Sequence, residues 1–297
     1  MSISSEITRL QNAKAALKTS IENKGVTVDS SLTLDGYAAK VDDISTGGGY
    51  DWASKAKQIV FERVDFTTDF PDTFTFSNSS VITCATAFRY AKLPKTVTVN
   101  VPACTNFNVA FVSGENNTIN QVENITISSN ANVTNCENMF NSGYYQKYKT
   151  ITLNFSTKNV TNFGAFLSNC YQLESILGTP LDFTSRTQGS GSSFFGDGSL
   201  VNHVRFVPNT LSTDFIARGA SGLDDDSIVS LANCLKAVSG KTLQFRSTIK
   251  PRCAQIIGTV STETDADQNQ YDFFTVDAGG TTTLEYFITT TKGWTLA

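Results

Sequence analysis

A short motif recurs along the middle of the chain, and this repetition constrains the fold more than any other feature. The four copies end in phenylalanine, at Phe88, Phe111, Phe140 and Phe166. Between the copies lie segments in which apolar and polar residues alternate; they begin at Val97, Ile125 and Ile151, 28 and 26 positions apart. One such unit cannot cover its own apolar face, whereas stacked units share a continuous core. The sequence therefore predicts a solenoid, mainly β with some α, over residues 51–297.

Strict alternation in segments 97–101, 125–128 and 151–155 predicts strands whose apolar residues face the core and whose polar residues face outward. The outward side chains are expected to form two rows, which we take as the candidate binding face: Thr98, Asn100, Thr126, Ser128, Thr152 and Asn154. Weaker strands are expected at 181–183, 204–207 and 243–246. They would extend the two rows through Asp182, Arg205 and Gln244 and through Thr184, Val207 and Arg246. Short hydrogen-bonding groups suit a neutral polysaccharide or a protein surface, but threonine is favoured on any exposed strand, so a merely solvated sheet is the alternative.

The phenylalanines and cysteines of the motifs are predicted to fill the core. Phe88, Phe111, Phe140 and Phe166 should stack as a ladder, one ring per coil. The chain has 6 cysteines, none in a Cys-x-x-Cys pair. We expect them to be small buried hydrophobic residues without disulfide bonds.

Residues 1–45 are predicted to form two helices. Five apolar residues at spacings of three, four and seven form a seam, with Lys14 in one core position: Ile3, Ile7, Leu10, Leu17 and Ile21. Gly25 should end the first helix, and a second stripe contains Leu34, Tyr37, Ala38, Val41 and Ile44. Such short helices are marginal alone. The segment is therefore either a simple helical hairpin or an anchor that oligomerises, and the Gly-rich residues 46–50 should link it to the solenoid.

A helical insert is expected near residues 223–239, followed by a C-terminal cap. Asp224, Asp225 and Asp226 stand at its start, where carboxylates stabilise the positive end of a helix dipole. Capping explains this triplet better than metal binding does. Gly240 is expected to end the helix.

No motif for catalysis or for a cofactor stands out, so we expect a protein that is not an enzyme and binds no cofactor or metal. His203 is the only histidine and should line a loop beside Val204, which leaves no partner for a multi-histidine metal site or a histidine-based triad. Asp265 opens a segment like a calcium loop, but Gln270 and Val276 occupy the positions that require Gly and Glu. A net charge of -4 gives no footprint for nucleic acid, and no apolar run is long enough to insert into a membrane. The N-terminus lacks the pattern of a signal peptide, so synthesis in a cytoplasm is expected.

The motifs resemble the BspA-like repeats of bacterial surface proteins, a leucine-rich-repeat class. Residues 133–140 (VTNCENMF) and 160–173 (VTNFGAFLSNCYQL) carry the likeness, which covers about residues 80–210. It implies a leucine-rich-repeat-like solenoid and says little about function.

Both ends of the chain resemble bacteriophage fibre proteins. Residues 18–28 and 37–44 look like a segment of phage tail and head fibres, and residues 291–297 (TKGWTLA) are similar to the terminus of phage proteins with these repeats. The resemblance implies a virion protein that forms homo-oligomers, often trimers. It would attach to other virion proteins through its N-terminus and contact a host glycan or protein through its solenoid. A bacterial cell-surface adhesin and a glycan-degrading tailspike are the alternatives; the latter requires paired carboxylates in a groove.

Overall fold

The structure, a computed structural model, describes residues 3–23, 26–33, 36–37, 40–41, 57–112, 122–141, 147–187, 194–195, 200–265 and 267–297. The chain divides into two compact units, Met1–Trp52 and Ala53–Ala297, and each is described by itself. The predicted linker, 46–50, lies outside the described residues.

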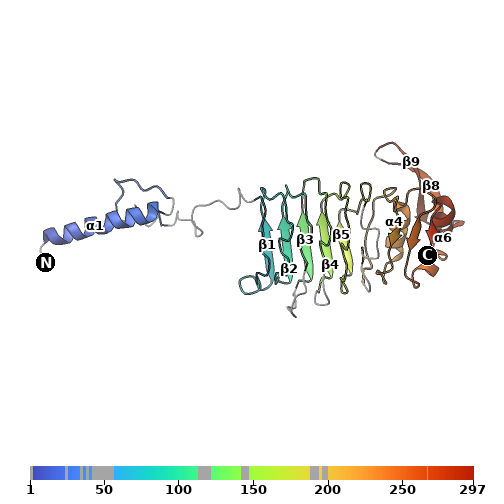
Figure 1. Cartoon of the computed structure of the whole chain (residues 1–297), viewed down its shortest axis with the longest axis horizontal. Coiled ribbons are helices and arrows are strands. Elements are labelled where there is room, and N and C mark those ends of the chain that lie inside the picture. Colours follow the sequence, from blue (N-terminus) through green and yellow to red (C-terminus); the bar gives the residue numbers. More distant parts are fainter. Residues whose placement is uncertain are drawn as a thin grey trace. The chain divides into compact units, whose positions relative to one another are not determined.

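The first unit contains one long helix, α1 (Ile3–Glu22) (Figure 1). Near its end the side chain of Ile21 is buried against Val28 and Tyr37. The ammonium of Lys14 lies 5.8 Å from the centre of the Tyr37 ring. Of the second predicted helix, residues 36–37 and 40–41 are described and are helical, whereas its other predicted core residues and Gly25 lie outside the described residues.

The second unit is a β-solenoid of about six turns, which confirms the predicted solenoid and its mainly β character. Five strands form one parallel sheet in chain order (Figure 1): β1 (Thr73–Ser77), β2 (Thr96–Asn100), β3 (Asn124–Ser128), β4 (Thr150–Asn154) and β5 (Ser175–Gly178). Strand β1, which precedes the first recognised motif, was missed. The prediction that a strand at 181–183 follows β4 was wrong, because β5 lies next to β4.

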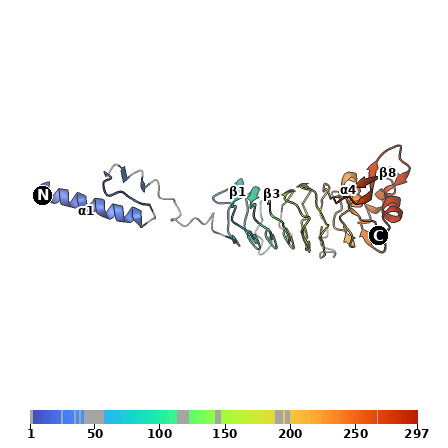
Figure 2. The ribbon, with the colours of Figure 1, turned by 90° about the horizontal axis from the view of Figure 1, so that it is seen from above.

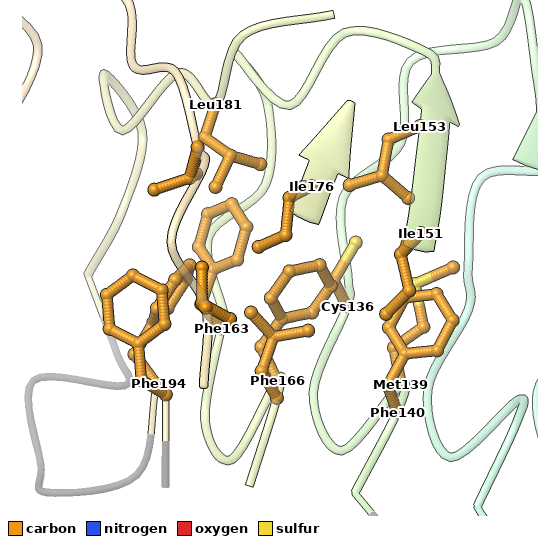
Figure 3. Packing of buried hydrophobic residues seen from close by; sticks show 14 of the residues in the cluster. Cys136, Met139, Phe140, Ile151, Leu153, Phe163, Phe166, Ile176, Leu181 and Phe194 are labelled. Atoms are coloured by element: carbon orange, nitrogen blue, oxygen red, sulfur yellow. The ribbon is translucent and has the colours of Figure 1, made fainter. Parts of the chain in front are cut away.

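The alternation of these strands builds the core. Inward residues such as Val97, Ile125 and Ile151 are fully buried. Figure 3 shows Ile151 beside the motif residues Met139 and Phe140. The four predicted rings form a ladder: ring centres lie 5.2 Å apart for Phe88 and Phe111, 5.6 Å for Phe111 and Phe140, and 5.7 Å for Phe140 and Phe166. The predicted ladder is confirmed. It continues at both ends, because Phe61 lies 5.4 Å from Phe88 and Phe194 lies 5.4 Å from Phe166.

The Thr-Asn pair found in three of the four motifs has a structural role at the corner of its coil. The side-chain oxygen of Asn135 accepts a hydrogen bond from the backbone N–H of Glu137 at 2.9 Å, and the other motif asparagines close the same turn. The hydroxyl of Thr134 donates to the carbonyl of Thr105, and that of Thr161 donates to the carbonyl of Thr134, each at 3.3 Å. The threonine therefore links neighbouring coils by a hydrogen bond, and the asparagine stabilises the turn of the chain.

The C-terminal part adds short elements to the last coils (Figure 2). In chain order they are β6 (Phe215–Ile216), α4 (Asp225–Cys234), β7 (Thr242–Gln244), α5 (Lys250–Cys253), β8 (Ile257–Thr264), β9 (Gln270–Val276), β10 (Thr282–Thr283), α6 (Leu284–Tyr286), the π-helix η1 (Phe287–Thr291) and β11 (Thr295–Leu296). Strands β8 and β9 form an antiparallel hairpin, and β10 pairs with the other edge of β8. In a separate sheet, β7 lies between β6 and β11. The hairpin was not predicted.

The predicted helical insert exists as α4, but it is shorter than expected. Asp224 caps its start by accepting a hydrogen bond from the backbone N–H of Ser227 at 2.7 Å, which supports the capping interpretation. The helix ends at Cys234, so the prediction that Gly240 closes it was wrong. Gly240 instead has φ +73° in the turn before β7, where a left-handed conformation favours glycine.

The last residues of the chain close the solenoid. Strand β11 adds in parallel to β7, and the indole N–H of Trp294 donates to the carbonyl of Lys236 at 2.8 Å. Lys292 is buried: its ammonium donates to the carbonyl of Asp272 at 2.7 Å and lies 5.1 Å from the centre of the Phe287 ring. The segment 291–297 is thus a structural cap.

Candidate functional site

The outward face of the parallel sheet carries the predicted rows in register. Thr98 pairs with Thr126, and Thr126 pairs with Thr152, so these side chains stand one strand apart, at about 4.8 Å. Thr75 of β1 extends the row on one side. On the other side Thr152 pairs with Leu177, whose side chain is 42% exposed. The expected continuation through Asp182, Arg205 and Gln244 was therefore wrong, because β5 lies next to β4.

The second predicted row has its own side-chain hydrogen bonds. Asn100, Ser128 and Asn154 are in register, and Ser77 precedes them. The amide of Asn154 donates to the hydroxyl of Ser128 at 3.4 Å, and that of Asn100 donates to Ser77 at 3.3 Å. Thr184, Val207 and Arg246, the expected continuation, lie outside the five strands of this sheet.

A third outward row was missed. It runs in register along the first residues of the strands: Thr73, Thr96, Asn124, Thr150 and Ser175. The sequence pattern could have predicted this row, because each of these polar residues directly precedes the first inward residue of its strand. The face is therefore three side chains wide and uncharged.

Charged side chains lie where this face begins. Lys149 and Lys95 approach the carboxylate of Glu123, just before β3, at 3.1 Å and 4.0 Å. The hydrogen bond from Lys149 lowers the pKa of Glu123. These ion pairs are exposed to water, so they contribute little to stability. At this edge of the neutral rows, the charges of lysine and glutamate offset one another.

The predicted seam on α1 is only partly covered. Ile21 is buried, whereas the side chains of Ile7, Leu10 and Leu17 are 52%, 49% and 39% exposed. The side chain of Ile3 lies outside the described residues. The described part of the seam therefore presents a row of apolar residues to solvent.

The groups considered for chemistry have structural surroundings. All six cysteines are buried as free thiols, which confirms that they serve as core residues. His203 lies beside the start of α4, with its Nδ1 3.0 Å from a carboxylate oxygen of Asp224. Asp265 accepts from the backbone N–H groups of Asp267 and Asn269 and so holds a turn. Among the described residues, no three His, Cys, Asp or Glu side chains gather as a metal site.

No helix among the described residues combines the length and apolar character needed to cross a membrane. Comparison with family models, with curated proteins and with solved structures found no match to this chain.

Proposed function

We propose that this chain is a non-enzymatic bacteriophage fibre or decoration protein, anchored to the particle through its N-terminal unit and contacting a host surface through its solenoid. The solenoid is, in this proposal, of the BspA-like leucine-rich-repeat class. The similarity of the chain's two ends to phage fibre proteins supports the assignment to a virion. The neutral three-row face is the observation that carries the assignment to binding, because a repeated array of hydroxyl and amide groups can contact an extended partner over several coils.

The α1 seam supports the anchor. Exposed Ile7, Leu10 and Leu17 occupy a/d positions of a heptad pattern, and packing against copies of the same helix would bury them. The resemblance to phage fibre proteins favours a trimer, whereas the seam itself does not set the number of copies.

Sedimentation of the full chain tests the anchor. Replacing Leu10 and Leu17 together with Lys should convert the oligomer to a monomer, because charged side chains cannot share a packed seam. The matched control replaces Asn12 and Thr19, exposed residues on the side of the helix opposite the seam, with Lys. A parent chain that is monomeric and does not bind particles would overturn the anchor.

Attachment to cells tests the binding face. Replacing Thr126, Thr152 and Asn154 together with Lys places three charges in the middle of the face and leaves the buried residues unchanged. The purified variant should fold like the parent and attach less to host cells. Unchanged attachment would reject the sheet face and direct attention to the loops or to the C-terminal part.

A further inference from the structure

The β8–β9 hairpin does not stand free of the solenoid. At its tip, Asp267 lies 3.9 Å from the ammonium of Lys158, and Asp265 accepts a hydrogen bond from the side chain of Asn209 at 3.4 Å. Lys158 and Asn209 belong to different coils, which the hairpin bridges. Between tip and coils lies an open cavity of about 310 Å³. Figure 1 shows β8, β9 and α4 together at the C-terminal end of the solenoid.

The cavity combines a small apolar wall with dense polar groups. Val207 and Pro208 form the apolar wall. Asp182, Asn209 and Lys236 contribute polar groups from three coils. A volume near 310 Å³ is at the lower end of the range for small-molecule sites, so one small ligand or one unit of a polymer fits.

Two charged groups in this cavity have hydrogen-bonding capacity to spare. One carboxylate oxygen of Asp182 accepts from the N–H and hydroxyl of Thr184, at 2.8 Å and 2.6 Å, and its other oxygen has no hydrogen-bond partner in the described part of the chain. The ammonium of half-buried Lys236 likewise has no ion-pair or hydrogen-bond partner among the described residues. The cavity therefore holds an available acceptor and an available donor.

The charges around the cavity nearly cancel. Lys158 and Lys236 face the carboxylates Asp182, Asp265 and Asp267, so the lining favours neither a strongly anionic nor a strongly cationic ligand. A sugar hydroxyl both donates and accepts hydrogen bonds, and it can use an acidic and a basic neighbour at once. The carbon face of a sugar ring would lie on the Val207–Pro208 wall.

We propose that this hairpin-tip cavity binds a neutral saccharide, with Asp182 accepting from one ring hydroxyl and Lys236 donating to another. The inference rests on the proposed host-surface function and gives it a ligand class and a second location. The hydrogen bond from the backbone N–H of Asn269 lowers the pKa of Asp265, which favours its charged form at the rim of the cavity.

The test measures binding of the full chain to immobilised neutral oligosaccharides and to matched uronic-acid-containing ones. Lys236→Met and Asp182→Asn should each weaken the best neutral interaction about tenfold, since hydrogen bonds to charged groups are the stronger kind. Lys250→Met, at an exposed position of α5, is the matched control and should bind like the parent. Circular dichroism and melting of each variant confirm that the solenoid is folded.

The outcomes separate this inference from the proposed function. A neutral saccharide that binds the parent and the sheet-face triple variant equally, but binds Lys236→Met weakly, supports the cavity even if the chain does not attach to cells. Parent-like binding by Lys236→Met and Asp182→Asn would overturn it, as would a preference for the acidic saccharides. A parent chain that attaches to cells and binds no neutral saccharide would also overturn it and leave the host-surface function standing. Shortened saccharide products would overturn the assignment to binding alone.

Discussion

In each of four successive coils, the residue three positions after the one that pairs at the corner lies in the left-handed backbone region. These residues are Thr86, Val109, Asn138 and Ala165, with φ between 50° and 59°. Asparagine is tolerated there, whereas a branched side chain such as that of Val109 is strained. The motif therefore fixes the backbone shape more strongly than it fixes the side chain.

Val109→Asn should stabilise the solenoid by about 1 kcal/mol, because it removes the left-handed penalty at a half-buried position. The reciprocal change, Asn138→Val, should destabilise by a similar amount and also removes the hydrogen bond from the side chain of Asn141. Urea unfolding of both variants measures the two changes in the free energy of unfolding. Equal midpoints for Val109→Asn and the parent would show that the strain is absent.

Phe140→Ala should cost about 3–5 kcal/mol in unfolding free energy, since it opens a cavity in the middle of the ring ladder. Phe140 is fully buried between two other rings of the ladder. Phe70 is 42% exposed, so Phe70→Ala is the matched control, with a loss near 1 kcal/mol. Similar losses of unfolding free energy for both variants would mean that the ring ladder does not contribute more to stability than an exposed ring does.

Buried ionisable groups give opposite slopes of stability against pH. Burial raises the pKa of Cys234 and of Cys253 from 9.0 to about 12, so unfolding releases protons and stability falls with pH above about 9. Burial lowers the pKa of Lys292 from 10.5 to about 8, so unfolding takes up a proton and stability rises between those values.

The slopes are measured by urea unfolding between pH 9 and 10.5 in the presence of a reductant. Cys253→Ala should make the alkaline decline shallower and Lys292→Met should make it steeper, each by up to about 1.4 kcal/mol per pH unit. Changes of the same sign in the two variants would contradict this assignment of the titrating groups.

At the scale of elements, the sequence signals succeeded where two inward residues alternate with polar ones, as in β2, β3 and β4. They failed at β5, which has one buried residue, Ile176, and an exposed Leu177, so no alternation was visible. They also failed at β8, where Gly258 is the one buried position. The hairpin is positioned by contacts with distant coils, such as Asn233 with the backbone of Phe274, and the cavity beneath its tip could not be found from spacing alone.

The C-terminal cap is an element whose loss should act locally. Removing residues 294–297 deletes β11 and leaves β7 without one of its two neighbours. Because coils of a solenoid are coupled mainly to their neighbours, amide exchange at Leu243 should accelerate while that at Ile127 in β3 stays slow. Trp294→Phe is the milder control, since it removes the hydrogen bond to Lys236 and keeps a ring. Uniform acceleration in all strands would contradict a local cap.

For the whole molecule, the central claim is that the chain is part of a phage particle and presents its solenoid for attachment. The most direct measurement is labelling of intact purified particles with gold-conjugated antibodies raised against residues 57–297, viewed by electron microscopy. We expect discrete label at fixed sites on the particle surface, on head or tail. Particles without label, with the chain found only in the soluble lysate, would contradict the claim.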